Sequence, residues 1–176
     1  MGRMEKYYKL ETRDYLWKII IHCTPGRREC QEADGTVPLV HPWPVSGFLR
    51  HQLLYCKAGI GFHLQILPGG KVGGAHEYNE YCILEVFSAK AGIIGLKGSK
   101  SRLYLAMNKS GKLYGSETFT LECLFKEQLE ENNYTTYSSS VRPDYYVALS
   151  RRGKAKKGGR VKKENAGALF IPRLIP

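Results

Sequence analysis

The fold is decided by three stretches of sequence that repeat one pattern: Phe62-His-Leu-Gln-Ile-Leu-Pro-Gly-Gly70-Lys-Val, Leu103-Tyr-Leu-Ala-Met-Asn-Lys-Ser-Gly111-Lys-Leu and Tyr145-Tyr-Val-Ala-Leu-Ser-Arg-Arg-Gly153-Lys-Ala. The three numbered glycines are 41 and 42 residues apart, and a lysine follows each of them. Apolar residues stand eight, six and four positions before each glycine, the period-2 pattern of a strand with one buried face. They are Phe62, Leu64 and Ile66; Leu103, Leu105 and Met107; and Tyr145, Val147 and Leu149. Each glycine then falls in a connecting turn, where a positive φ is often required.

A repeat of this length is typical of folds built from similar units. Three units are too few for a β-propeller, and a period of 2 excludes a helical solenoid. The remaining architecture is all-β, a threefold pseudo-symmetric barrel of short hairpins called a β-trefoil. The 19 glycines and 12 tyrosines agree with many short strands joined by turns. We therefore expect a β-trefoil domain over residues 49–176.

Residues 1–48 differ from the rest of the chain in composition and periodicity, and we interpret them as an irregular N-terminal extension. They contain both tryptophans and the proline-marked run Pro38-Leu-Val-His-Pro-Trp-Pro44, with poor periodicity. The apolar run Tyr15 to Cys23 is too short for a membrane span and is interrupted by Lys18. It starts late and lacks a clear small-residue cleavage site, so it does not predict a signal peptide.

Charge is the outlier in the composition, with 27 Lys and Arg against 16 Asp and Glu and a net charge of +11. Residues 151–163, which we call the basic stretch, contain eight cationic residues and no acidic one: Arg151, Arg152, Lys154, Lys156, Lys157, Arg160, Lys162 and Lys163. Glycines interrupt the stretch, so we expect a curled loop that presents backbone amides together with the cations. Such a loop attracts closely spaced anions.

Two other interpretations of the basic stretch remain open, a solvated loop or nuclear-localisation-like run and a nucleic-acid site. Nucleic-acid binding usually adds aromatic stacking beside the cations, and the stretch contains no aromatic residue. A sulfated polysaccharide needs only charge and hydrogen-bond donors. We therefore favour a sulfated sugar as the partner.

The sequence contains no catalytic constellation, so we expect no enzyme, no cofactor and no metal site. The five cysteines are odd in number and show no CxxC spacing, and the five histidines are scattered. The segment Gly69-Gly-Lys-Val-Gly-Gly74 lacks the register of a phosphate-binding loop, and we interpret it as a hairpin turn.

Further motifs resemble the fibroblast growth factors over about residues 50–176: Leu54-Tyr-Cys56, Gly61-Phe-His-Leu-Gln65, Tyr104-Leu-Ala-Met-Asn-Lys109, Gly111-Lys-Leu-Tyr-Gly115, Glu122-Cys-Leu-Phe125, Glu130-Glu-Asn-Asn-Tyr134, Tyr146-Val-Ala-Leu149 and Leu169-Phe-Ile-Pro-Arg173. The likeness is to secreted, paracrine members. It implies an extracellular β-trefoil growth factor that binds heparan sulfate and the ectodomain of a receptor tyrosine kinase, and stimulates cell proliferation and differentiation. The alternative is an intracellular trefoil that binds a channel or scaffold protein without activating a receptor.

The resemblance also implies which residues make the two sites. The heparin site would comprise the eight cations of the basic stretch, although many relatives have an asparagine where this chain has Lys57 and Ala58. Asn165 and Ala166 likewise replace the glutamine and lysine that relatives often carry. The receptor site would comprise an apolar patch with two polar anchors: Tyr55, Tyr134 and Ile171, with Glu127 and Asn132.

Other positions concern receptor preference, thiols and glycosylation. His76 and Thr135 depart from residues common in relatives, which leaves receptor preference open. Cys56 and Cys123 occupy positions usually occupied by structural thiols, whereas a bridge between Cys23 and Cys30 is only a possibility. Asn108-Lys-Ser110 and Asn133-Tyr-Thr135 are glycosylation sequons, and we expect Asn133 to be largely unmodified because a glycan there would obstruct Tyr134.

Overall fold

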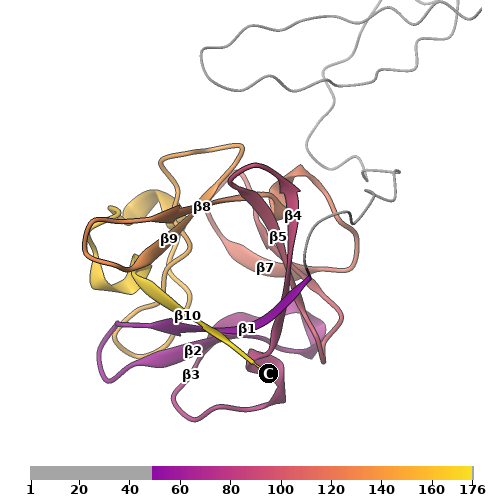
Figure 1. The fold of residues 1–176 in the computed structure, drawn as a ribbon, viewed down its shortest axis with the longest axis horizontal. Coiled ribbons are helices and arrows are strands. Elements are labelled where there is room, and N and C mark those ends of the chain that lie inside the picture. The colour runs from indigo at the N-terminus through magenta and orange to yellow at the C-terminus, as the bar shows by residue number, and fades with distance from the viewer. Residues whose placement is uncertain (1–48, 176) are drawn as a thin grey trace, which may run out of the picture. The chain divides into compact units, whose positions relative to one another are not determined.

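The computed structural model describes residues 49–175, so the extension predicted over residues 1–48 lies outside the described part of the chain. All regular elements of the described part are short strands and 3-10 helices (Figure 1). The strands are β1 Arg50–Cys56, β2 Phe62–Ile66, β3 Val72–Ala75, β4 Leu84–Lys90, β5 Ile93–Gly98, β6 Tyr104–Met107, β7 Leu113–Ser116, β8 Phe125–Leu129, β9 Thr135–Ser139 and β10 Phe170–Leu174. The 3-10 helices are η1 Pro68–Gly70, η2 Glu80–Cys82, η3 Leu121–Cys123, η4 Gly158–Arg160 and η5 Ala166–Ala168. Within residues 49–175, no helix has the length and hydropathy needed to cross a membrane.

Six of the strands close into a barrel. β1 pairs with both β10 and β4, β4 with β5, β5 with β8, β8 with β9, and β9 with β10, all antiparallel. The hairpins β2–β3 and β6–β7 lie beside this ring, next to β1 and β5 (Figure 1). Closure leaves the barrel strands without an unpaired edge. The predicted all-β trefoil is confirmed.

The predicted inward-facing residues fill the core in the first repeat and most of the second. Phe62, Leu64 and Ile66 are buried on alternate positions of β2, as the period-2 pattern requires. Leu105 and Met107 are likewise buried on β6, and both belong to the main hydrophobic cluster. The prediction is wrong in detail for Leu103, which precedes β6 and is only partly buried against the core.

The strand predicted over Tyr145 to Leu149 is wrong as a strand. The segment makes two isolated bridges, Ser138 with Tyr146 and Leu149 with Ala155. Its backbone bonds go to different partners in turn, because Val147 N donates to Tyr137 O at 2.8 Å and Leu149 N to Gly167 O at 2.9 Å. No single neighbour offers a continuous ladder, although Val147 and Leu149 are buried as expected.

The repeated glycines occupy the turns as predicted. Gly70, Gly111 and Gly153 have φ of +83°, +80° and +72°, in the left-handed region that favours glycine. A Cβ added at Gly70 would lie 2.8 Å from Gly115 O, on the second repeat.

Each turn meets the next repeat at its glycine, by a backbone hydrogen bond in two cases and by a close backbone approach in the third, and the contacts form a closed cycle. Gly158 N of the third repeat donates to Gly111 O at 2.8 Å. Gly74 N of the first repeat donates to Gly153 O at 2.7 Å. With the approach of Gly70 to Gly115, the three turns connect repeat one to two, two to three and three to one.

Cys56, Cys82 and Cys123 are unpaired thiols buried in the domain. Cys82 and Cys123 end the equivalent helices η2 and η3, 41 residues apart. Burial raises the pKa of all three thiols above the ordinary value, which keeps them protonated and unreactive. The implied structural role of Cys56 and Cys123 agrees with this environment, whereas Cys23 and Cys30 lie outside the described residues.

We predict that Gly70→Ala lowers the free energy of unfolding by about 3 kcal/mol or more, because it combines left-handed strain with a clash against backbone. Gly69→Ala is the matched control, since Gly69 has a φ of +80° and nothing within 4 Å of an added Cβ. The control costs only the strain, about 1–2 kcal/mol. Urea denaturation of both variants measures the difference, and equal losses would contradict the interlocking role of Gly70.

Candidate functional site

The basic stretch lies on the surface as a loop. Its first turn is built on Ser150, whose Oγ accepts the N–H groups of Arg152 at 3.3 Å and Lys154 at 3.1 Å. Seven of the eight cationic residues are exposed, and Lys156 is half-buried. Only Lys163 forms an ion pair with a described acidic residue, Glu130, at 3.6 Å. The other seven cations therefore keep their charge available to a ligand.

The expectation that this loop presents backbone amides is wrong for most of its amides. Lys156 N donates to Ala148 O at 2.9 Å, and Arg160 N to Lys157 O at 3.0 Å. The amides of the first turn are used by Ser150 in the same way. A glycine-interrupted loop satisfies its donors internally here, so its side chains supply the positive charge.

The loop between β1 and β2 adjoins the basic stretch. A Cβ added at Gly59 would lie 2.6 Å from Arg151 O, so the two backbones touch there. Lys57 at the start of this loop lies over the ring of Tyr134, with Nζ 4.8 Å from the centroid. Lys57 thus links the basic stretch to the apolar patch predicted for a receptor.

Two further cations, Lys71 and Lys112, were not predicted as part of a site, and they meet four cations of the basic stretch. A hollow of about 850 Å³, which we call the basic hollow, is lined by the hairpin turns of all three repeats. Six of its lining residues are cationic: Lys71, Lys112, Arg152, Lys154, Lys156 and Lys157. The signal for Lys71 and Lys112 was present in the sequence, as the lysine that follows each repeated glycine.

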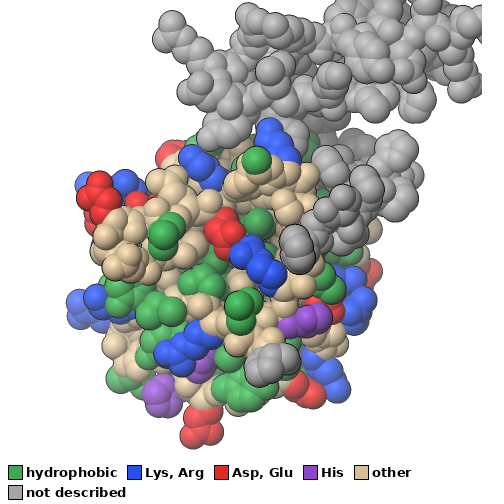
Figure 2. Space-filling view, viewed as in Figure 1, with side chains coloured by type: hydrophobic (Ala, Val, Ile, Leu, Met, Phe, Trp, Pro, Cys, Tyr) green, Lys and Arg blue, Asp and Glu red, His purple; other side chains and the backbone are tan. Residues whose placement is uncertain are grey.

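The three apolar residues predicted for a receptor surface lie in a row across neighbouring strands. Tyr55 of β1 is the register partner of Ile171 of β10. Phe170 pairs with Thr135, and one further step of this antiparallel register sets Ile171 opposite Tyr134. We call Tyr55, Ile171 and Tyr134 the apolar row. Figure 2 shows hydrophobic side chains gathered over the middle of the face where β1 and β10 run.

Other side chains support Tyr55 in a fixed orientation. The guanidinium of Arg173 lies 4.8 Å from its ring centroid, and the ring of His63 meets it edge-on at 5.3 Å. Desolvation and the nearby Arg173 lower the pKa of His63, so its ring stays neutral at physiological pH. Aromatic side chains held in this way lose little entropy on binding a partner.

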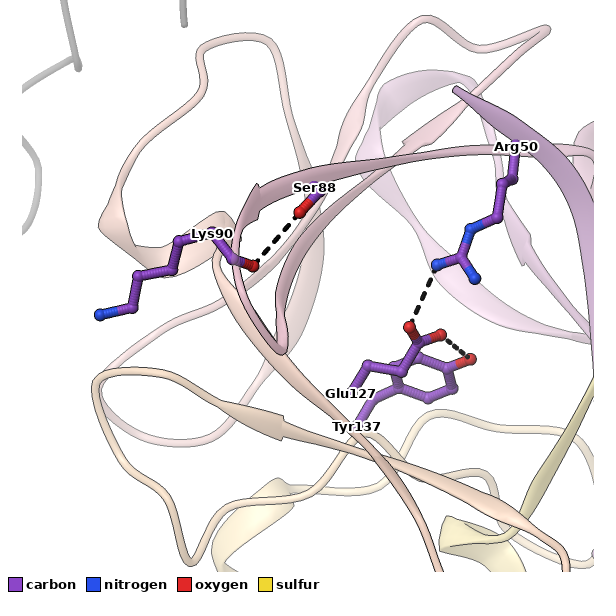
Figure 3. A network of polar contacts seen from close by, with 5 residues as sticks. All are labelled: Arg50, Ser88, Lys90, Glu127 and Tyr137. Atoms are coloured by element: carbon purple, nitrogen blue, oxygen red, sulfur yellow. Dashed lines mark hydrogen bonds and ion pairs between the residues drawn. The ribbon is translucent and has the colours of Figure 1, made fainter. Parts of the chain in front are cut away.

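The two predicted polar anchors differ in how firmly they are held. Glu127 of β8 accepts hydrogen bonds from Arg50 at 3.1 Å and from the Tyr137 hydroxyl at 3.2 Å, as Figure 3 shows. Asn132 is exposed in the β8–β9 turn, where its Oδ1 accepts the N–H of Tyr134 at 3.1 Å. Glu127 thus presents a fixed carboxylate, and Asn132 presents beside Tyr134 an amide whose NH₂ group has no hydrogen bond to a described residue.

Comparison with known proteins gives a consistent group of relatives. A family model described as Fibroblast growth factor matches residues 50–171. Fibroblast growth factor 5 of the dog is 44% identical over 161 residues, which cover 87% of this chain and 59% of that protein. The human protein of that name is 48% identical over 139 residues, 74% of this chain and 52% of that protein. Fibroblast growth factor 4A of Xenopus laevis is 38% identical over 168 residues, 96% of this chain and 86% of that protein.

The chain therefore spans between about half and three fifths of the length of its fibroblast growth factor 5 relatives.

We predict that Tyr137→Phe lowers the free energy of unfolding by about 0.5–1.5 kcal/mol at neutral pH, because it removes the bond to Glu127. Burial, and then the Glu127 carboxylate, raise the pKa of Tyr137 above its ordinary value. Stability from a raised pKa is complete below the unfolded value near 10 and is lost as pH rises above it. Tyr137→Phe therefore unfolds with a shallower alkaline decline, measured by urea denaturation from neutral to alkaline pH.

The control is Tyr134→Phe, which removes a hydroxyl that has no hydrogen bond to a described residue. It changes the free energy of unfolding by less than about 0.5 kcal/mol. An alkaline decline that is unchanged in Tyr137→Phe would show that this hydroxyl does not stabilise the fold.

Proposed function

We propose that this chain, which belongs to the fibroblast growth factor family, is a secreted growth factor that binds heparan sulfate and activates a fibroblast growth factor receptor tyrosine kinase. It acts as a ligand and carries out no chemistry of its own. The glycan and the receptor bind to different surfaces of one barrel, and their joint assembly brings the receptor kinases together. The observation that carries the proposal is the adjacency of the basic stretch and the apolar row through Lys57 and the β1–β2 loop.

The basic stretch suits a sulfated polysaccharide. Its exposed cations lie on a rigid surface and, apart from Lys163, have no ion pair to a described residue. Binding a polyanion therefore breaks few existing interactions and releases the counterions condensed on the polyanion. The same argument gives affinity for any polyanion, so nucleic acid is the competing ligand that the experiment must exclude.

The apolar row suits a protein partner. Aromatic anchors bordered by polar groups are characteristic of the energetic centre of protein interfaces. Tyr55 and Tyr134 are already oriented by cation–π contacts, with Arg173 and Lys57 respectively. Asn132 adds an amide in the turn that contains Tyr134, and Glu127 adds a fixed acceptor on the neighbouring strand β8. We infer that this face contacts the receptor.

Adjacency of the two surfaces explains why a glycan would strengthen receptor binding. The β1–β2 loop touches the basic stretch at Arg151, and Lys57 of the same loop lies over Tyr134. A sulfated chain on the stretch thus extends towards the receptor surface and can contact both proteins. Simultaneous contacts raise the effective concentration of each partner near the others.

The direct test is titration of the purified chain with a fibroblast growth factor receptor ectodomain, with and without a heparin oligosaccharide. We expect specific binding that tightens when heparin is present, and a weakening of about tenfold or more for Tyr134→Ala, since anchor truncations commonly cost over 1 kcal/mol. Heparin retention of Tyr134→Ala should be unchanged. Heparin binding without receptor binding would contradict the proposal and favour the intracellular scaffold-binding alternative.

The glycan site has its own test in a variant with Arg151, Arg152, Lys156 and Lys157 changed to Ala. We expect this variant to elute from a heparin column at clearly lower salt, because four charges of the site are lost. The control changes Lys90, Lys97, Lys100 and Lys126 to Ala, which alters the net charge equally. Equal losses of heparin retention in the site variant and the control variant would contradict a specific glycan site. Equal affinity of the wild-type chain for duplex DNA and heparin at one salt concentration would contradict it as well.

A further inference from the structure

The basic hollow is formed by the pseudo-threefold symmetry of the fold. Lys71, Lys112 and Lys154 each follow the repeated glycine of one hairpin turn, and all three line the hollow. The turns are held together by the close contacts at Gly70, Gly111 and Gly153. Backbone hydrogen bonds and close backbone contacts therefore hold the three turns, and the lysines that follow their glycines, near one another.

Only positive charge lines this hollow. Its lining contains six cationic residues and no Asp or Glu, and none of the six forms an ion pair with a described acidic residue. One carboxylate nearby, Glu122, accepts a hydrogen bond from the hydroxyl of Tyr114, a residue of the lining. Burial and Glu122 raise the pKa of Tyr114, so the phenol remains a neutral donor to that carboxylate.

The six cations that line the concave surface together attract an anion into the hollow. The low-dielectric walls focus the field of the cations into the hollow, and their mutual repulsion destabilises the fold slightly until an anion enters. A compact anion with several charges contacts cations from three directions, which a linear surface cannot offer. The backbone around the hollow is rigid, so only the lysine side chains are ordered on binding.

We propose that the basic hollow is a binding site for a compact polyanion, a group of closely spaced sulfates or phosphates held by Lys71, Lys112 and Lys154. It is a separate subsite from the outer part of the basic stretch, where Arg151, Arg160, Lys162 and Lys163 do not line the hollow. Arg152, Lys156 and Lys157 belong to both surfaces and connect them. Only the identification of the anion as part of a sulfated glycan rests on the proposed function.

The test compares Lys71→Gln/Lys112→Gln with a control of equal charge that lies outside both the hollow and the basic stretch, Lys97→Gln/Lys126→Gln, by isothermal titration calorimetry at low salt. The probes are inorganic tripolyphosphate and a trisulfated heparin disaccharide. We expect the wild-type chain to bind at least one probe, and the hollow variant to bind it about tenfold or more weakly, while the control changes little. Without a probe, the hollow variant should melt at the same or a higher temperature, since it removes repulsion.

The outcomes separate the sources of the anion. If the hollow variant loses affinity for the disaccharide, with or without a loss of affinity for tripolyphosphate, sulfated glycan enters the hollow. If the hollow variant loses affinity for tripolyphosphate alone, the site binds a small phosphate compound. The proposal is overturned if the wild-type chain binds neither probe, or if the control variant loses as much affinity as the hollow variant.

Retention of the wild-type chain on long-chain heparin is measured in parallel. If the wild-type chain is not retained on heparin, the proposed function is contradicted. The tripolyphosphate titration then still tests the hollow independently.

Discussion

The structure depends on the close approach of three glycine turns to the neighbouring repeats. Gly70 meets Gly115, Gly111 meets Gly158, and Gly153 meets Gly74, with backbone atoms in direct contact or hydrogen-bonded. Side chains at these points would force the repeats apart, because the neighbouring atoms belong to backbone that cannot rotate away. The contacts form a cycle, so each repeat is held by the other two. The position of every surface loop follows from this closure.

Both candidate binding surfaces follow from the way in which the barrel closes. The apolar row arises where the C-terminal strand β10 lies between β1 and β9 (Figure 1), which brings Tyr55, Ile171 and Tyr134 together from distant parts of the chain. The basic stretch occurs in the third hairpin, whose backbone makes only isolated bridges. Without a continuous ladder, that hairpin can contain a long cationic loop without disturbing the six-stranded ring.

Much of the fold could be predicted from the sequence, because period-2 burial and positive-φ glycines are local properties. Leu64, Leu105 and Gly111 obey such local rules, and their environments agree with the predictions. The strand predicted at Tyr145 to Leu149 failed for the opposite reason. Whether an extended segment becomes a strand depends on which carbonyl groups lie beside it, and here they come from two separate elements.

The sequence by itself determined the trefoil, the family and the residue types at the candidate sites, since repeats, turn glycines and charge runs are written in order along the chain. Only the tertiary structure decided that Lys71 and Lys112 join the basic stretch around one hollow, and that Glu127 is held by Arg50 and Tyr137. It also decided that the amides of the loop are already used. These outcomes depend on distances between residues far apart in sequence, which only closure of the barrel sets.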